Sequence, residues 1–147
     1  MPCKLKNAHY KSTEQFYGTA NVEILAGNTI ANPVILQPVR VITDTGVSID
    51  DGVILTTGTY RLSGGVVVEG TTAGVITIAI TDNGVTLPES VRSVTVGAGE
   101  TVTINTETVR YFEACCAISH ATDFIVYTDG TAVAEITLMA GNIIKEA

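Results

Sequence analysis

Histidine chemistry is the first possibility that the sequence raises. Nucleophilic catalysis needs a nucleophile beside a base that a third group orients. The chain has two histidines, His9 and His120. His9 lies in the polar N-terminal segment, and His120 lies in a predicted loop with Asp123 nearby. A solvated loop histidine explains His120 better than a catalytic pair does. We therefore predict no catalytic residues and a protein that is not an enzyme.

The cysteines give a second set of chemical options. The chain has three, at positions 3, 115 and 116, without C-x₂-C or H-x₃-H spacing for a metal. Neighbours on a strand point to opposite faces, so a bond between Cys115 and Cys116 is not expected. We predict two reduced thiols that pack as small apolar groups. A bond between chains through Cys3 is left open.

Oxygen ligands and glycine-rich loops are equally weak signals. Asp50-Asp51 and Asp82-Asn83 offer oxygens to Ca²⁺, although acidic turn residues usually cap turns. Gly64-Gly65 and residues 97–99 lack the lysine and the strand-to-helix context of a phosphate loop. The prediction is no cofactor and no metal, with calcium at a turn kept as the minor alternative.

The composition predicts an all-β domain. The 147 residues suit one domain and include 22 Thr, 18 Val and 15 Ile, which favour pleated surfaces. Asn-Gly, Asp-Gly and Gly-Gly pairs recur at short intervals and predict many turns. No apolar run approaches the ~18 residues of a membrane span, and the N-terminus lacks the apolar region of a signal peptide. The spacing of these turns predicts about eight to ten strands, which is typical of a sandwich or barrel.

Charge divides the chain into two parts. The net charge is −7, yet residues 1–11 carry Lys4, Lys6 and Lys11 and no acid. The remainder has 15 acids and five bases, a net of −10. The acidic body should repel nucleic acid and anionic membranes, so neither is a predicted partner. We interpret residues 1–20 as a docking arm outside the core, and residues 21–147 as the β-domain. A frayed terminus with incidental lysines is the alternative.

Particular strands can be assigned from the pattern. Pro33 and Pro38 place residues 21–42 at a sheet edge or subunit boundary. Residues 75–81 alternate, so their isoleucines should face the core. Asp82-Asn83-Gly84 and Asp129-Gly130 predict hairpin turns, and Gly64-Gly65 predicts a bulge or a close backbone approach.

Several short motifs, taken in order, resemble the C1q/TNF-like jelly-roll domains of phage and prophage virion proteins. They are Gly58-Thr59-Tyr60, residues 74–80, Gly84-Val85 with Pro88, residues 96–103, Val109-Arg110 and Cys115-Cys116. The resemblance covers about residues 47–140, and Asn83 is an extra residue in the turn. It implies an antiparallel jelly-roll β-sandwich, trimeric and without catalytic apparatus.

The resemblance also implies a function. It predicts a homotrimeric capsid decoration or head-fibre protein on the virion surface, assembled in the host cytoplasm and bound to the major capsid protein or another virion protein. The alternative is a receptor-binding module at the tip of a phage tail fibre or bacterial surface filament, recognising a host glycan or surface protein. The chain lacks a fibrous shaft and has no Trp, which favours the first.

Two sets of residues are the predicted contact sites. Apolar residues on both faces of "YFEACCAI" and "AVAEITLM" predict a three-fold interface, with the candidates Tyr111, Ala114, Cys116 and Met139. The arm should bind the capsid through charges and apolar anchors, namely Lys4, Lys6, Tyr10, Lys11, Phe16 and Tyr17.

Overall fold

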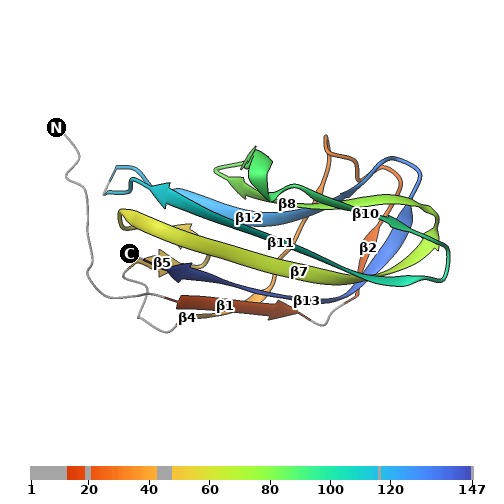
Figure 1. Cartoon of the computed structure of the whole chain (residues 1–147), viewed down its shortest axis with the longest axis horizontal. Helices are drawn as coiled ribbons and strands as arrows, with labels where there is room; N and C mark the ends of the chain where they lie inside the picture. Colours follow the sequence, from red (N-terminus) through yellow and green to blue (C-terminus); the bar gives the residue numbers. More distant parts are fainter. Residues whose placement is uncertain (1–12, 19–20, 43–47, 116, 147) are drawn as a thin grey trace.

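The computed structural model describes residues 13–18, 21–42, 48–115 and 117–146. They form an elongated sandwich of two antiparallel sheets, as the predicted jelly roll requires (Figure 1). No helix among these residues is long and apolar enough to cross a membrane.

The first sheet contains the longest strands. Its spatial order is β11 (Thr101–Phe112), β7 (Gly58–Thr72), β13 (Val133–Lys145), β1 (Thr13–Gly18) and β4 (Val39–Ile42), while β2 (Val22–Ile24) also pairs with β13. The predicted edge position of the proline-containing segment is confirmed for β4, which begins directly after Pro38 and is the last strand of this sheet.

The second sheet has shorter strands at its margins. Its spatial order is β10 (Arg92–Val96), β8 (Gly74–Asp82), β12 (His120–Thr128), β6 (Val53–Ile54) and β5 (Ile49–Asp50). In addition, β3 (Val34–Ile35) pairs with β12, and β9 (Val85–Thr86) pairs with β8. A single 3₁₀ turn, η1 (Pro88–Ser90), separates β9 from β10 within the described chain.

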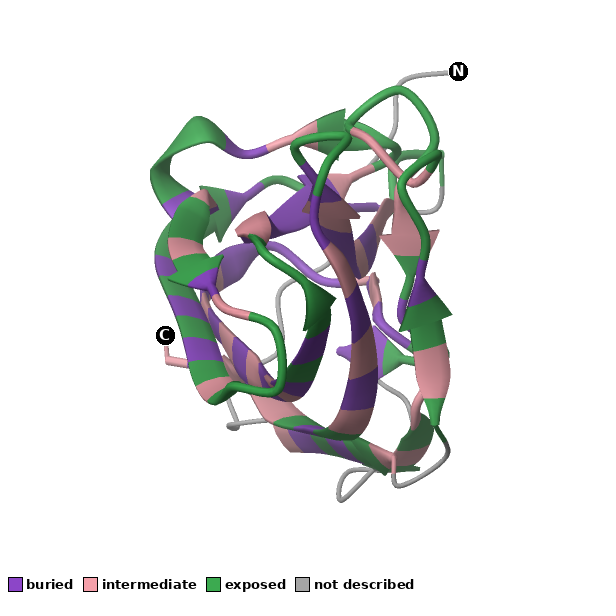
Figure 2. Ribbon diagram, turned by 90° about the vertical axis from the view of Figure 1, so that its right-hand side faces the viewer, coloured by how far each residue is buried: buried purple, intermediate pink, exposed green. Residues whose placement is uncertain are grey.

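The core lies between the sheets and follows the period of two along each strand. Ile76, Ile78 and Ile80 of β8 are fully buried, which confirms the predicted isoleucine face. In β7 the even-numbered residues from Gly58 to Gly70 are buried and most residues between them are half-buried. Figure 2 shows this alternation as purple bands along the strands. Each fully buried isoleucine contributes about 1.5–3 kcal/mol relative to an exposed one.

The β8–β9 hairpin explains why a proline follows so closely. Asn83 and Gly84 have φ values of 48° and 81°, the left-handed geometry of a tight hairpin turn. The strand then ends at Thr86, and Pro88 opens η1, where its missing N–H costs no ladder bond. The fully buried Ser90 then supplies a hydrogen-bond acceptor to β8, because Ile80 donates its N–H to the Ser90 hydroxyl, 2.8 Å away. Pro88 therefore marks the point where the chain leaves the sheet.

Close approach explains the paired glycines in β7. The register through Gly64 and Gly65 is continuous, so the bulge alternative is not what forms here. A Cβ on Gly64 would lie 2.8 Å from the Phe124 ring and 3.0 Å from the Phe16 ring. The register shifts of this strand pair lie elsewhere. Thr71 of β7 is the extra residue at the first shift, and Thr137 of β13 is the extra residue at the second.

Strand β1 corrects the predicted boundary of the arm. Residues 13–18 pair with β13 on one side and with β4 on the other, so this part belongs to the sandwich. Phe16 is 2 % exposed, and its ring packs 4.9 Å from that of Phe124. Glu14, fully buried, accepts a 2.6 Å bond from Arg40 and a bond from the N–H of Gly52. The polar character of "STEQ" concealed a strand whose alternate residues face the core.

The cysteine prediction is also corrected. Cys115 is disulfide-bonded and 4 % exposed, rather than a reduced filler. The other two cysteines, Cys3 and Cys116, lie outside the described residues. Cys115 lies just beyond the end of β11, where it forms an isolated β-bridge with Ile118.

Candidate interaction surface

The outer face of the first sheet is the face turned away from the core. Strand alternation selects which side chains it presents, and the register aligns them in cross-strand rows. One row, hereafter the polar row, runs across four strands and contains Gln15, Asn142, Ser63 and Glu107. The neighbouring row contains Tyr17, Ala140, Gly65 and Asn105. Two adjoining rows thus place polar groups next to very small residues.

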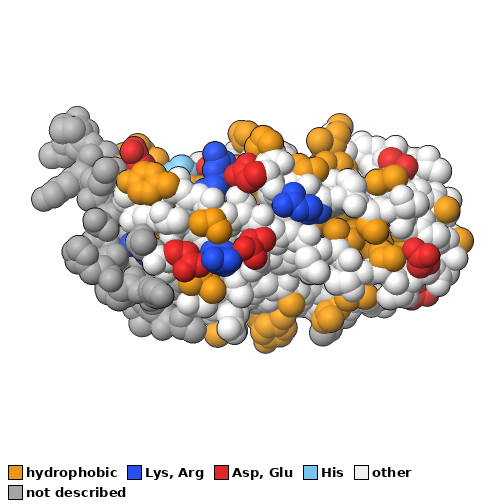
Figure 3. Space-filling model, in the orientation of Figure 1, with side chains coloured by type: hydrophobic (Ala, Val, Ile, Leu, Met, Phe, Trp, Pro, Cys, Tyr) orange, Lys and Arg blue, Asp and Glu red, His pale blue; other side chains and the backbone are white. Residues whose placement is uncertain are grey.

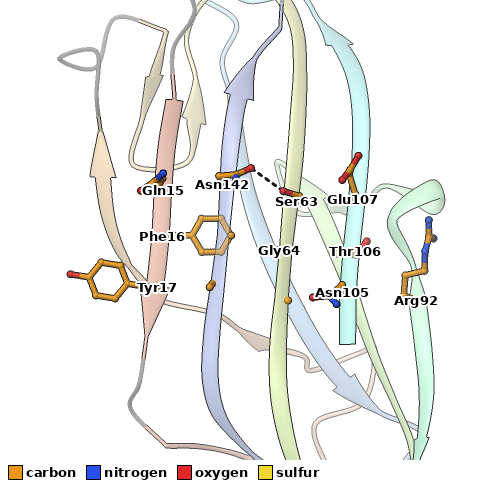
Figure 4. A pocket seen from close by; sticks show the side chains of 13 residues that line it. Gln15, Phe16, Tyr17, Ser63, Gly64, Arg92, Asn105, Thr106, Glu107 and Asn142 are labelled. Carbon is orange, nitrogen blue, oxygen red and sulfur yellow. Dashed lines mark hydrogen bonds between the residues drawn. The ribbon is translucent and has the colours of Figure 1, made fainter. Parts of the chain in front are cut away.

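These rows form a depression in the middle of the face, hereafter the trough. Its volume is about 710 Å³. Gly65 and Ala140 form the bottom of the trough, and neither residue has a side chain large enough to fill it. Figure 4 shows Gln15, Asn142 and Ser63 on adjacent strands, with Asn105 directed toward the floor. The trough is therefore wide enough for several side chains or a small ligand.

The hydrogen bonds of the trough are incomplete within one chain. Ser63 donates to the Oδ1 of Asn142 over 2.9 Å (Figure 4). The side-chain amides of Gln15 and Asn105 form no hydrogen bond with other described residues. Water satisfies these groups while the face is open, but any partner that covers it must offer them donors and acceptors.

Exposed apolar side chains surround the trough, and we call them the apolar rim. Eleven large apolar residues are exposed in the described chain, and six of them lie on this face. They are Tyr17, Val39, Val41, Val109, Tyr111 and Leu138. Figure 3 shows separate apolar groups (orange) around a central area that is mainly white, with a few charged side chains. Apolar groups gathered on one face are typical of an interaction surface.

Paired charges lie beside the polar row. Arg61 forms 2.7 Å contacts with both Glu107 and Glu146. The hydrogen bond to Glu146, followed by the charges of both carboxylates, raises the pKa of Arg61 above its ordinary value. Arg92 lines the trough at its β10 end. Two arginines and two glutamates thus balance around the trough.

A smaller cavity of about 350 Å³ lies near the end of β11 and contains His120. His120 begins β12 rather than lying in a loop, and its partner is Asp82, not Asp123. Its Nδ1 lies 3.0 Å from the carboxylate of Asp82, and its Nε2 lies 2.8 Å from the carbonyl oxygen of Glu113. The loop prediction failed because the strand begins earlier than the apolar run. The ring ties the β8–β9 turn to the segment after β11.

The residues predicted for the three-fold interface do not lie on one common surface. Tyr111 is 60 % exposed on the apolar rim. Ala114 and Met139 are buried in the core of the same chain, so neither can be a surface contact. The bulge after Ile136 shifts the alternation of β13 and turns Met139 inward. Cys116 lies outside the described residues.

The predicted arm residues are also divided. Tyr17 is half-exposed on the apolar rim, whereas Phe16 is in the core and is not presented to a partner. The other four, Lys4, Lys6, Tyr10 and Lys11, lie outside the described residues. Sequence reasoning missed Gln15, Ser63 and Asn142, because only the cross-strand register brings them together.

The described residues contain no group of three or more His, Cys, Asp or Glu side chains placed to hold a metal ion. Asp50 and Asp51 lie in the short β5–β6 hairpin, where Asp51 contacts Arg40 at 3.4 Å. Asp82 is engaged by His120. Each of these acidic groups thus has a role in a turn or ion pair.

Comparison with solved structures shows a shared fold. Murine APRIL at pH 5.0 matches with a TM-score of 0.53 and 14 % identity, over 92 % of this chain and 99 % of that one. The Eiger TNF of S. frugiperda matches with a TM-score of 0.51 and 10 % identity, over 93 % of both chains. The globular domain of zebrafish complement 1qA matches with a TM-score of 0.50 and 9 % identity, over 90 % and 96 %. A scan against protein-family models and a search of curated proteins found no match.

The chain therefore has the TNF/C1q-like jelly-roll fold, which confirms the predicted fold class. At these identities the likeness concerns the fold alone.

Proposed function

We propose that this protein is a structural protein of a phage virion, a homotrimeric capsid decoration or head-fibre protein. The apolar rim on the outer face of the first sheet is the structural observation that carries the self-association. The sequence resemblance to jelly-roll domains of phage virion proteins supplies the virion context. The proposal assigns the chain no catalytic role.

Self-association follows from the energetics of the outer face. Six exposed apolar side chains stay in contact with water in a single chain. Covering them contributes about 25 cal/mol for each Å² of apolar area removed from water. Because the chains are identical, every copy presents the same apolar face. A closed ring of copies leaves none of these faces uncovered.

Attachment to the capsid is assigned to residues 1–12, which precede β1. This segment contains Lys4, Lys6 and Lys11 and no acidic residue, whereas the remaining chain is strongly acidic. Opposite charge favours contact with acidic side chains on the capsid. Three such segments on one trimer would bind together, so a weak single contact becomes tight through high effective concentration.

A truncation tests the attachment. Residues 1–12 are removed, and Thr13 is kept because β1 begins there. The expected product is an oligomer of unchanged order that no longer sediments with capsids. A matched control replaces the three lysines by glutamine in the full-length chain and should weaken attachment partially. Normal occupancy of the truncated protein on particles would show that the docking surface lies in the jelly roll.

A receptor-binding role at a fibre tip is the second candidate. Leu25 and Ile30 are more than half-exposed in the loop of residues 25–32. Asn28 accepts a bond from Thr128, which places this loop beside the β12–β13 turn. That turn lies at the opposite end of the first sheet from the start of β1. A module anchored by its N-terminus would present this loop to a host surface. Binding to host cells but not to capsids would favour this candidate.

A further inference from the structure

We propose that the polar row and Asn105 determine the number of copies in the oligomer. The inference rests on the proposed self-association through the outer face. Its occupant is a second copy of this chain. The polar groups of the trough do not drive association; they restrict it to one arrangement.

The size of the outer face fits a copy of the same chain. Strands lie about 4.8 Å apart and rise about 3.3 Å per residue, so the five strands of this face present roughly 800 Å². Each partner in a stable interface contributes about that area. A small peptide would leave much of the apolar rim uncovered.

The charge distribution also fits a second copy. Two acidic chains of net charge −7 repel each other over most of their surfaces. Around the trough, however, Arg61 and Arg92 balance Glu107 and Glu146. Three other acids of this sheet, Glu69, Glu135 and Glu23, lie side by side on neighbouring strands toward the β12–β13 turn. An equally acidic copy meets least repulsion at the trough.

The arrangement of polar and apolar groups is the reverse of an ordinary interface. Interfaces usually have an apolar centre and a polar rim. Here the apolar rim surrounds a centre whose amides, on Gln15 and Asn105, lack partners among the described residues. A partner seated on the rim must bury those amides. Buried amides without hydrogen bonds are costly, so only some arrangements of copies are acceptable.

The rim alone would not choose among these arrangements. Contact between apolar side chains is non-directional, and rings of two, three or four copies could bury similar apolar areas. Amides have fixed donors and acceptors, so they are satisfied in one geometry and left unpaired in others. A single buried asparagine sets the oligomer order of coiled coils in the same manner. In this sheet Gln15, Asn142 and Asn105 supply that constraint.

The test replaces amides by apolar side chains of similar length. The variant Gln15→Leu/Asn142→Leu keeps the rim and makes the trough apolar. Mass photometry and light scattering of wild type should give one oligomer, while the variant should give a mixture of orders at equal or greater total association. A matched control, Thr95→Leu, adds leucine to the exposed face of β10 in the second sheet and should leave the single mass unchanged.

Two further measurements separate the possible failures. If the double variant does not fold, as judged by circular dichroism, Asn105→Leu makes the test on strand β11, where this side chain has no hydrogen bond to other described residues. A wild-type monomer at micromolar concentration would overturn the proposed self-association itself. A single wild-type oligomer with folded variants of the same single mass would overturn only the role of the amides.

Discussion

The outer faces of the two sheets differ in how many large apolar side chains they expose, although the strands of both sheets carry apolar residues at inward and outward positions. On the second sheet, the outward residues of β8 are small, and Thr77, Ala79 and Thr81 are all buried. Thr77 exchanges a 2.7 Å hydrogen bond with Ser93 of β10. Among the described residues, the strands of the second sheet contain two exposed large apolar residues, Ile35 and Val85. The outer face of the first sheet has six.

The difference shows how a sheet face can be completed in two ways. The second sheet closes its face within one chain, because short side chains are covered by longer neighbours such as Tyr127 and Ile125, which pair with Thr77 and Ala79. The first sheet has long side chains at its margins and glycine at its centre, so neighbours within the chain cannot cover it. The face of the second sheet is covered within one chain, whereas the face of the first stays exposed in one chain, and the proposed self-association would cover it.

The largest effect is expected where the first sheet is joined to the second. Glu14→Ala removes the buried carboxylate that binds Arg40 and the N–H of Gly52. Leaving Arg40 without its buried partner should lower the free energy of unfolding by about 3–5 kcal/mol. Denaturant titration measures this, and Glu14→Gln, which keeps an acceptor, should lose less. Equal losses in the two variants would contradict the ionic role.

A charge placed on the apolar rim should break the association of the first sheet only. Val109→Glu/Leu138→Glu introduces two carboxylates that association would bury without partners. The dissociation constant should rise about 100-fold or more, which corresponds to roughly 2.7 kcal/mol. Sedimentation equilibrium measures the constant. The control Thr95→Glu, on the outer face of the second sheet, should leave it unchanged; an equal effect would show that the faces do not differ.

Filling the floor beneath the trough should destabilise the fold itself. In Gly64→Ala, the new Cβ would lie 2.8 Å from Phe124 and 3.0 Å from Phe16, so the two rings must shift. The expected loss is about 1–3 kcal/mol of unfolding free energy, measured by thermal and chemical unfolding. At Gly97 the nearest heavy atom lies 3.7 Å away and belongs to the Glu100 side chain. Gly97→Ala should therefore change stability little.

The smallest effect is expected at low pH, at the turn that connects the second sheet to the first. Backbone N–H groups of Ala132, Thr131 and Val75 lower the pKa of Asp129 from 3.8 to about 2. A lowered pKa in the folded state adds stability above the unfolded value, and this contribution is lost as pH falls from about 4 to 2. Unfolding midpoints across that range should fall less steeply in Asp129→Asn. Parallel curves would contradict this role.

The sequence predicted what depends on local pattern. The turns at Asn83-Gly84 and Gly130 follow from residues that tolerate positive φ, and the isoleucine face of β8 follows from strict alternation. Prediction from the sequence failed for strands whose alternating pattern is short or interrupted. Strand β1 has six residues of mixed polarity, and its two buried positions are a glutamate and a phenylalanine.

The candidate surface was predictable only in part. Tyr111 was predicted at an outward position because its strand carries apolar residues on both faces, whereas Tyr17 was assigned to an arm outside the sheets. Met139 was assigned to the wrong face because a bulge changes the alternation of β13. The trough depends on pairing between strands that are far apart in the chain. Periodicity gives no strand order or register, so the meeting of Gln15, Asn142 and Ser63 had no signal in the sequence.

The pairing of β1 with β13 has a consequence for folding during synthesis. Thr13 pairs with Ile144 and Gly18 with Met139, so the first described strand pairs with residues that come more than 120 positions later in the sequence. A ribosome must translate the chain as far as about Ile144 before the first sheet can be closed. Until then Phe16 and the buried carboxylate of Glu14 remain in water, and the long edge of β7 lacks its partner on one side. Such distant pairing is intrinsically slow, so the nascent chain depends on a late step during which its strand edges are exposed to aggregation.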